Sequence, residues 1–209
     1  MQTVFIYEPD RTALQLNKSE IYRYLGHKQG MDISCEVSAM VEEVLEAVLK
    51  NSVPKVCYKR FDVKIEDEID FGFLQVKSKE LACNLAECTE TIIFAATIGI
   101  FTDRQIQKET LLSPAKACVY QAVGATVIEA VCDDFNEWLL HEEEKNGNTL
   151  KPRYSPGYGD VALQIQKDIC RELDTAKHIG ITVTDSMLMI PEKSVTAFMG
   201  IIRDKYEYT

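Results

Sequence analysis

The sequence lacks the paired cysteines and clustered histidines that mark compact metal sites. Its seven cysteines are an odd number without a C-x-x-C pair, and the closest two, Cys83 and Cys88, are separated by four residues. The three histidines, His27, His141 and His178, are scattered along the chain. We therefore expect no zinc or iron–sulfur site and no disulfide framework, with most cysteines buried as small apolar residues. The same scatter offers no Cys–His or Ser–His arrangement for covalent catalysis.

Positive charge is also scarce. The chain has 23 Lys and Arg against 33 Asp and Glu, a formal net charge of −10, and no basic cluster interrupts this excess. Such a chain repels polyanions, so we expect no nucleic-acid partner. No apolar run approaches the roughly 20 residues that span a bilayer, and Met1–Phe5 lacks the basic region of a signal peptide. We expect a cytoplasmic protein with no membrane association.

Repeats and low-complexity tracts are absent as well, and 209 residues are enough for one good hydrophobic core. We expect residues 1–209 to form a single domain.

Apolar spacing predicts helices where apolar residues recur every three or four positions, and strands where they alternate or run together. The predicted helices are residues 36–51, 78–87, 103–112, 114–142, 161–173 and 174–179. The predicted strands are residues 53–64, 71–76, 91–97, 181–190 and 194–203.

The order of these elements indicates the fold class. Residues 91–97 are continuously apolar, which is typical of a central strand buried on both faces. We expect residues 53–64 and 71–76 to pair as a hairpin, and residues 142–152 to form a solvated, flexible loop. Because helices and strands are mixed without regular βαβ alternation, we predict an α+β fold with a mostly antiparallel twisted sheet packed against long helices.

The most informative segment is Arg153–Asp160, with the sequence Arg-Tyr-Ser-Pro-Gly-Tyr-Gly-Asp. Pro156 restricts the backbone, while Gly157 and Gly159 tolerate positive φ and allow close approach to the main chain. Arg153 offers a rigid fork of donors for a carboxylate or phosphate, and the two tyrosines offer flat faces with polar tips. The segment predicts either a loop that binds a small zwitterionic or aromatic ligand, or a plain structural turn with one surface arginine.

This segment resembles the Arg-Pro-Ala-Pro-Gly-Tyr loop of the activation domain of cobalamin-dependent methionine synthase. Val127–Ala130 is similar to the Leu-Ala-Glu-Ala helix of that domain, and Thr184–Pro191 to its Thr-Glu-Ser-Phe-Ala-Met-Trp-Pro stretch. Ser194-Val195-Thr196 is similar to its Ser-Val-Ser strand. Arg23–Gly26, Arg-Tyr-Leu-Gly, matches the free-standing bacterial versions of the domain. The resemblance covers nearly the whole chain and is firmest from about residue 91.

The resemblance implies a methionine synthase activation domain-like fold and S-adenosylmethionine as ligand. Residues 91–209 would then form the S-adenosylmethionine-binding core and residues 1–90 an N-terminal part. It implies that Arg153 binds the ligand carboxylate and that Glu129 binds its ammonium or a ribose hydroxyl. Ser155 and Gly157 would offer main-chain groups to adenine, and Tyr158 a ring or hydroxyl.

The resemblance further implies a helper component of methionine synthase. The chain has no cobalt-ligating Asp-x-His-x-x-Gly motif and no Cys-Cys zinc site, and it does not include a folate-binding barrel. It would therefore support reductive methylation of cob(II)alamin carried by a separate cobalamin-binding methionine synthase chain. The electron would come from a flavodoxin-like or ferredoxin donor. Two alternatives remain: a non-catalytic S-adenosylmethionine-binding sensor, and an interaction module without a ligand.

Several residues allow more than one interpretation. Asp160 could contact a ligand, but we expect it to act as a helix N-cap. Ser194 and Thr196 could face the ligand or belong to plain sheet. Tyr206 or Tyr208 could replace an aromatic residue found near the ligand in the family. Tyr154 and Ser155 replace the proline and alanine of the family loop, and no early acidic ligand has a counterpart here.

Overall fold

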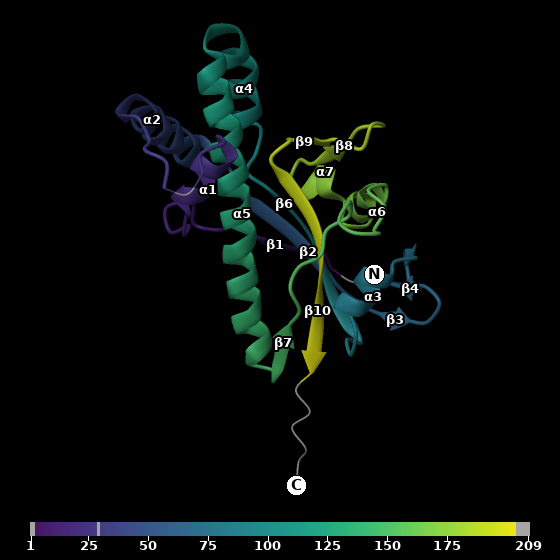
Figure 1. Cartoon of the computed structure of the whole chain (residues 1–209). Coiled ribbons are helices and arrows are strands. Elements are labelled where there is room, and N and C mark those ends of the chain that lie inside the picture. The colour runs from purple at the N-terminus through teal and green to yellow at the C-terminus, as the bar shows by residue number, and fades with distance from the viewer. Residues whose placement is uncertain (1–2, 29, 204–209) are drawn as a thin grey trace.

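A five-stranded antiparallel sheet, in the order β1-β2-β6-β10-β7, lies at the centre of the molecule (Figure 1). The computed structural model of the chain describes residues 3–28 and 30–203. The strands of this sheet are Phe5–Tyr7 (β1), Lys55–Asp62 (β2), Glu90–Thr97 (β6), Asn148–Leu150 (β7) and Ser194–Arg203 (β10). Each of its strand pairs is antiparallel. The predicted α+β class with a mostly antiparallel sheet is confirmed.

The predicted helices are all present. The helices of the described residues are Lys18–Tyr24 (α1), Cys35–Asn51 (α2), Lys79–Asn84 (α3), Phe101–Leu112 (α4), Pro114–Glu144 (α5), Ile165–Glu172 (α6) and Thr175–His178 (α7). Local chemistry accounts for their starts: Ser34 caps α2 by accepting from the amide of Val37, and Pro114 occupies the first turn of α5. Helix α1 was not predicted, and α3 and α6 are shorter than expected.

Both faces of the sheet are buried. Side chains alternate along β6, so Ile92, Phe94 and Ala96 face α5, while Ile93 and Ala95 face the opposite side. One layer, the α5-side core, contains α1, α2 and α5; the other, the α6-side core, contains α3 and α6. Figure 1 shows α5 running along one side of β10, with α6 and α7 on the other. The prediction of a central strand at residues 91–97 is confirmed.

The predicted hairpin between residues 53–64 and 71–76 is wrong. β2 pairs with β1 on one edge and β6 on the other, so neither edge is left for a further partner. Residues 71–74 instead form a turn, in which the amide of Phe71 donates to the carbonyl of Leu74 at 3.0 Å. A separate small sheet lies beside it, made of Lys64–Ile65 (β3), Ile69–Asp70 (β4) and Gln75–Val76 (β5).

The predicted flexible loop at residues 142–152 contains a strand. α5 continues to Glu144, and β7 then pairs with β10, with Leu150 opposite Ile201. The polar side chains of this segment find partners within the protein: Asn148 Nδ2 donates to Glu143 at 2.8 Å, and Arg60 pairs with the same carboxylate. These contacts hold the charged segment 142–152 against the sheet. The composition of the segment alone did not indicate this position.

The predicted strand at residues 181–190 is a short hairpin. Thr182–Val183 (β8) pairs with Met189–Ile190 (β9), and residues 184–188 form the turn between them. Thr184 Oγ1 accepts from the amide of Leu188 at 3.0 Å, and Met187 has a φ of +65°. The threonine side chain therefore favours a turn at a place where the alternating pattern favoured a strand. The strand predicted at residues 194–203 is confirmed as β10.

Helix α5 is long and apolar enough, by length and composition, to cross a membrane, although charged residues such as Lys116 and Glu129 interrupt its apolar residues. Of its most apolar stretch, 67% is buried inside the structure. A core helix of a soluble protein has these same properties, because its apolar surface is covered by neighbouring elements.

Candidate functional site

The loop from Arg153 to Asp160 crosses the edge of the sheet beside β10. The backbone of Tyr154 exchanges two hydrogen bonds with Phe198, at 2.9 and 2.8 Å, which attaches the start of the loop to the strand. The amide of Gly157 then donates to the carbonyl of Val161 at 2.9 Å, closing a turn. Gly157 has a φ of +88° and Gly159 a φ of +51°. These glycines permit a tight path that residues with a Cβ rarely adopt.

Arg153 projects from this loop onto one face of α5. Its Nη2 donates to Glu129 Oε2 at 2.6 Å, and its Nη1 to Asp133 Oδ1 at 2.5 Å. Asn136 has one side-chain orientation in which both its amide nitrogen and its amide oxygen form hydrogen bonds. In that orientation the oxygen accepts from Arg153 Nη1 at 2.8 Å. The three partners lie at positions i, i+4 and i+7 of the helix, which places them on one face. The guanidinium is thus held in a defined orientation.

Electrostatics keep this arginine charged. Burial disfavours its charge, but the hydrogen bond to Asp133 and the nearby carboxylates hold the pKa of Arg153 above its ordinary value. Beneath the cluster lies Cys132, where burial raises the pKa of the thiol to about 12. Cys132 is therefore an inert core residue, and the ionic chemistry belongs to Arg153, Glu129 and Asp133.

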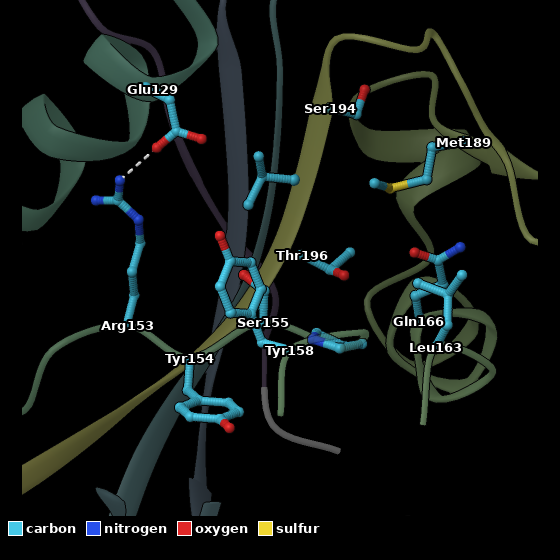
Figure 2. A pocket seen from close by; sticks show the side chains of 12 residues that line it. Glu129, Arg153, Tyr154, Ser155, Tyr158, Leu163, Gln166, Met189, Ser194 and Thr196 are labelled. Atoms are coloured by element: carbon cyan, nitrogen blue, oxygen red, sulfur yellow. Dashed lines mark hydrogen bonds and ion pairs between the residues drawn. The ribbon is translucent and has the colours of Figure 1, made fainter. Parts of the chain in front are cut away.

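Figure 2 shows the cavity that this loop forms together with α5, α6 and β10. Its volume is about 490 Å³, within the range of small-ligand sites. Glu129 and Arg153 stand at one end, whereas Leu163, Gln166 and Met189 stand at the other. Thr196 contributes from β10 along the cavity between them. A ligand in this space would meet opposite charges at one end and mainly apolar walls at the other.

Four of the five predicted ligand residues line this cavity: Glu129, Arg153, Ser155 and Tyr158. Tyr158 is 73% exposed, so its ring stands at the mouth. Gly157 is outside the cavity lining, and its amide serves the turn to Val161. Ser194 and Thr196 are both strand residues and cavity-lining residues, so the two interpretations of these positions are compatible.

Several residues of the candidate site were not predicted from the sequence. Asp133 and Asn136 hold Arg153, and the i, i+4, i+7 spacing from Glu129 was the signal that could have identified them. Leu163 and Gln166 line the cavity from the start of α6 and the turn before it, and no local pattern marks them as cavity residues.

Asp160 accepts hydrogen bonds at the start of a helix, but that helix is α3, whose N-cap residue is Ser78, and not the helix that follows Asp160 in sequence. Its carboxylate accepts from the hydroxyl of Ser78 and, at 2.8 Å, from the amide of Lys79, at the start of α3. The expected cap of the helix that follows in sequence is therefore wrong, because α6 begins only at Ile165. Tyr206 and Tyr208 lie outside the described residues.

A second hollow of about 380 Å³ adjoins the first and shares Glu129 and Tyr158 with it. Arg23 and Tyr24, from the stretch that resembles the free-standing bacterial versions, line this hollow together with Glu20. Arg23 pairs with Glu20 and lies over the ring of Tyr24 at 4.6 Å. The N-terminal part of the chain therefore lies next to the cavity.

Fold and cavity together define an α+β domain with a ligand-sized site between a long helix, a strand and a glycine-containing loop. Among solved structures, the chain is similar to the crystal structure of the MetH reactivation domain bound to AdoHcy, with a TM-score of 0.70 and 15% sequence identity. The match covers 100% of this chain and 81% of that chain. At this identity the likeness shows the fold, and the expected activation domain-like fold is confirmed. No family model and no curated protein matches the sequence.

Proposed function

We propose that this chain binds S-adenosylmethionine in the cavity and is a cytoplasmic reactivation subunit. In that role it supports reductive methylation of cob(II)alamin on a separate cobalamin-dependent methionine synthase. The observation that carries the proposal is the placement of Arg153 and Glu129 at one end of a cavity whose far end is mainly apolar. S-Adenosylmethionine has the matching distribution, with a carboxylate and an ammonium at one end and adenine at the other. A solved domain with this fold binds AdoHcy, the demethylated form of that ligand.

Each side chain has a role that its position supports. Arg153 retains N–H groups beyond those given to Glu129 and Asp133, and these can bind the ligand carboxylate. Glu129 is half-exposed and can accept from the ammonium while it still pairs with Arg153. Ser155 offers main-chain groups to the adenine, and the ring of Tyr158 covers the mouth. Gly157 then contributes by shaping the turn.

The chain would bind and orient the methyl donor, while its partners would supply the rest of the chemistry. The corrinoid of the partner synthase would receive the methyl group, and a flavodoxin-like or ferredoxin donor would supply one electron. The contribution of this chain is positioning, since holding a donor in the reactive geometry removes much of the entropic barrier.

Calorimetric titration with S-adenosylmethionine tests the proposal. We expect saturable one-to-one binding that Arg153→Ala weakens by at least about tenfold, or about 1.4 kcal/mol. Arg171→Ala is the matched control, because this arginine pairs with Asp168 on α6 and does not line the cavity. Absence of both binding heat and thermal shift at millimolar ligand would contradict the proposal and favour an interaction module.

A second experiment separates reactivation from sensing. The chain with bound ligand is mixed with a cobalamin-carrying synthase and a reduced flavodoxin, and methylcobalamin formation is followed by its absorbance. Methylation that depends on this chain and is lost in Arg153→Ala supports reactivation. Ligand binding without methylation of any supplied corrinoid protein would support the non-catalytic sensor.

A further inference from the structure

The loop that lines the cavity is attached to α3, which packs on the face of the sheet opposite α5. Asp160 lies at the end of the loop, and its carboxylate accepts from the Ser78 hydroxyl and from the Lys79 amide at 2.8 Å. The amide of Glu80 adds a longer contact of 3.4 Å to the same carboxylate. Asp160 and Ser78 are separated by 82 residues in sequence, so this contact connects two distant parts of the fold.

A second attachment joins the start of the loop to the same helix. The hydroxyl of Tyr154 donates to Glu80 Oε2 at 2.8 Å. This hydrogen bond passes over Gly159, where a Cβ would overlap both the Tyr154 hydroxyl and the Glu80 carboxylate. The glycine therefore allows the two attachments to exist side by side.

The segment between these attachments contains three of the residues that line the cavity. Ser155, Pro156 and Tyr158 line the cavity, and Gly157 and Gly159 both have positive φ. Glycines lose more conformational freedom on ordering than other residues, so an unattached loop of this composition would be costly to order on ligand binding. Attachment to α3 reduces the number of conformations available before a ligand arrives.

The ionisation of both groups agrees with these contacts. The hydrogen bond from Ser78, followed by that from the Lys79 amide, lowers the pKa of Asp160 below its ordinary value. The hydrogen bond to Glu80 raises the pKa of the Tyr154 hydroxyl to about 12. At neutral pH Asp160 is thus a charged acceptor and Tyr154 a neutral donor, as the two attachments require.

We propose that Asp160 and Glu80 are positioning residues that fasten the ligand loop to α3 and so keep the cavity wall preformed. Neither residue lines the cavity. They would act on affinity through the order of the loop, because a preformed site avoids part of the entropic cost of binding. The effect on affinity rests on the proposed function, whereas the effect on loop order does not.

Amide hydrogen exchange without ligand tests the structural half. In Asp160→Ala we expect exchange of the peptide covering residues 155–161 to rise by at least about tenfold, with exchange of β6 and α5 unchanged. Asp160→Asn keeps one acceptor oxygen, so its increase should be intermediate. Glu80→Ala removes only the exposed partner of Tyr154, and it keeps the test valid if Asp160→Ala fails to fold. Asp67→Ala, which removes an exposed carboxylate from the β3–β4 turn, is the matched control.

Calorimetry on the same variants tests the effect on affinity. We expect the Kd for S-adenosylmethionine to rise about tenfold in Asp160→Ala, less in Asp160→Asn, and not at all in Asp67→Ala. Loop exchange unchanged from wild type in folded Asp160→Ala and Glu80→Ala would overturn the inference, as would faster exchange with unchanged affinity. Failure of wild-type protein to bind the ligand would refute the proposed function alone, because the exchange measurement still decides whether α3 orders the loop.

Discussion

Arg153 is the residue on which the proposed binding of S-adenosylmethionine depends. Glu129, Asp133 and Asn136 hold its guanidinium from one face of α5, so its unused donors point in a defined direction. The two carboxylates exceed the single cationic group by one charge. Such a cluster favours a ligand that brings a positive charge along with its carboxylate, as S-adenosylmethionine does.

Glu129→Gln tests this charge balance. We expect it to weaken S-adenosylmethionine binding by about tenfold, because in the proposed site the ligand ammonium would lose a carboxylate partner and keep only an amide oxygen. The measurement is calorimetric titration. Glu137→Gln, an exposed carboxylate two turns further along α5, should leave the Kd unchanged. An equal effect of both substitutions would show that the overall charge of α5, not the placement of Glu129, controls affinity.

The cysteines differ in accessibility, and this can be measured directly. Burial is the main cause that raises the pKa of Cys57 and Cys132 to about 12, and burial also raises the pKa of Cys88 and Cys170. Because the thiolate is the reactive form, these four thiols should resist iodoacetamide at pH 8 in the folded protein. The exposed cysteines should be labelled, and they are Cys35, Cys83 and Cys118.

Mass spectrometry of tryptic peptides gives the labelling pattern. Labelling in denaturant is the control, in which all seven cysteines should react. Rapid modification of Cys132 in the native state would contradict its buried position beneath Arg153. It would also contradict the expectation that most cysteines are buried at the residue that supports it best.

At the scale of single elements, β10 links the site to the core. Ser194 and Thr196 of this strand line the cavity. The strand pairs with β6 through eight residue pairs, and its Phe198 pairs with Tyr154 of the loop. Further along, Gly200 lies against buried Leu85 and Cys88, where a Cβ would come within 2.9 Å of Leu85 Cδ2 and 2.6 Å of Cys88 Sγ. A side chain at this position has no room.

Gly200→Ala should therefore destabilise the fold by about 1–3 kcal/mol, the usual cost of overpacking a core. Urea unfolding gives the free energy of unfolding. In a double-mutant cycle, Cys88→Ala removes the nearest atom and should recover part of the loss. Additive effects of the two substitutions would show that the contact at 2.6 Å does not determine the cost.

At the scale of the whole molecule, one sheet carries two cores. The α5-side core includes Phe94 and Phe135, and the α6-side core includes Phe198, which stacks on Phe71 with ring centroids 5.1 Å apart. Strand β2 from the N-terminal part pairs with β6 along its full length. The two parts expected at residues 1–90 and 91–209 therefore share one sheet, and the prediction of a single domain can be tested by cooperativity.

Phe198→Ala provides that test. Phe198 is fully buried, so its loss should cost about 3–5 kcal/mol. The single tryptophan, Trp138, packs against the opposite core and reports on it by fluorescence. In one cooperative domain the fluorescence midpoint in urea should fall together with the midpoint from circular dichroism. An unchanged fluorescence midpoint would show that the two cores unfold separately.

Prediction from sequence succeeded where local signals are strong. Helix α2 follows from apolar residues at helical spacing, and β6 from a continuous apolar run. It failed at residues 71–76 and 181–190, where short strands and turns share the same β-branched and aromatic residues. In those segments, whether a residue lies in a strand or in a turn depends on which sheet edge is available for pairing. The available edge is a property of the folded chain.

The fold class, the long core helix, and the loop whose arginine, tyrosines and glycines indicate a ligand could all be predicted from the amino-acid sequence alone. These features depend on residues close together in the chain, where spacing and side-chain chemistry act directly. The folded chain was needed to show that Asp133 and Asn136 hold Arg153, that Asp160 accepts from the first amide of α3, and that Leu163 and Gln166 line the cavity. Those contacts join segments far apart in sequence, and which segments meet is set by burial on the two faces of one sheet.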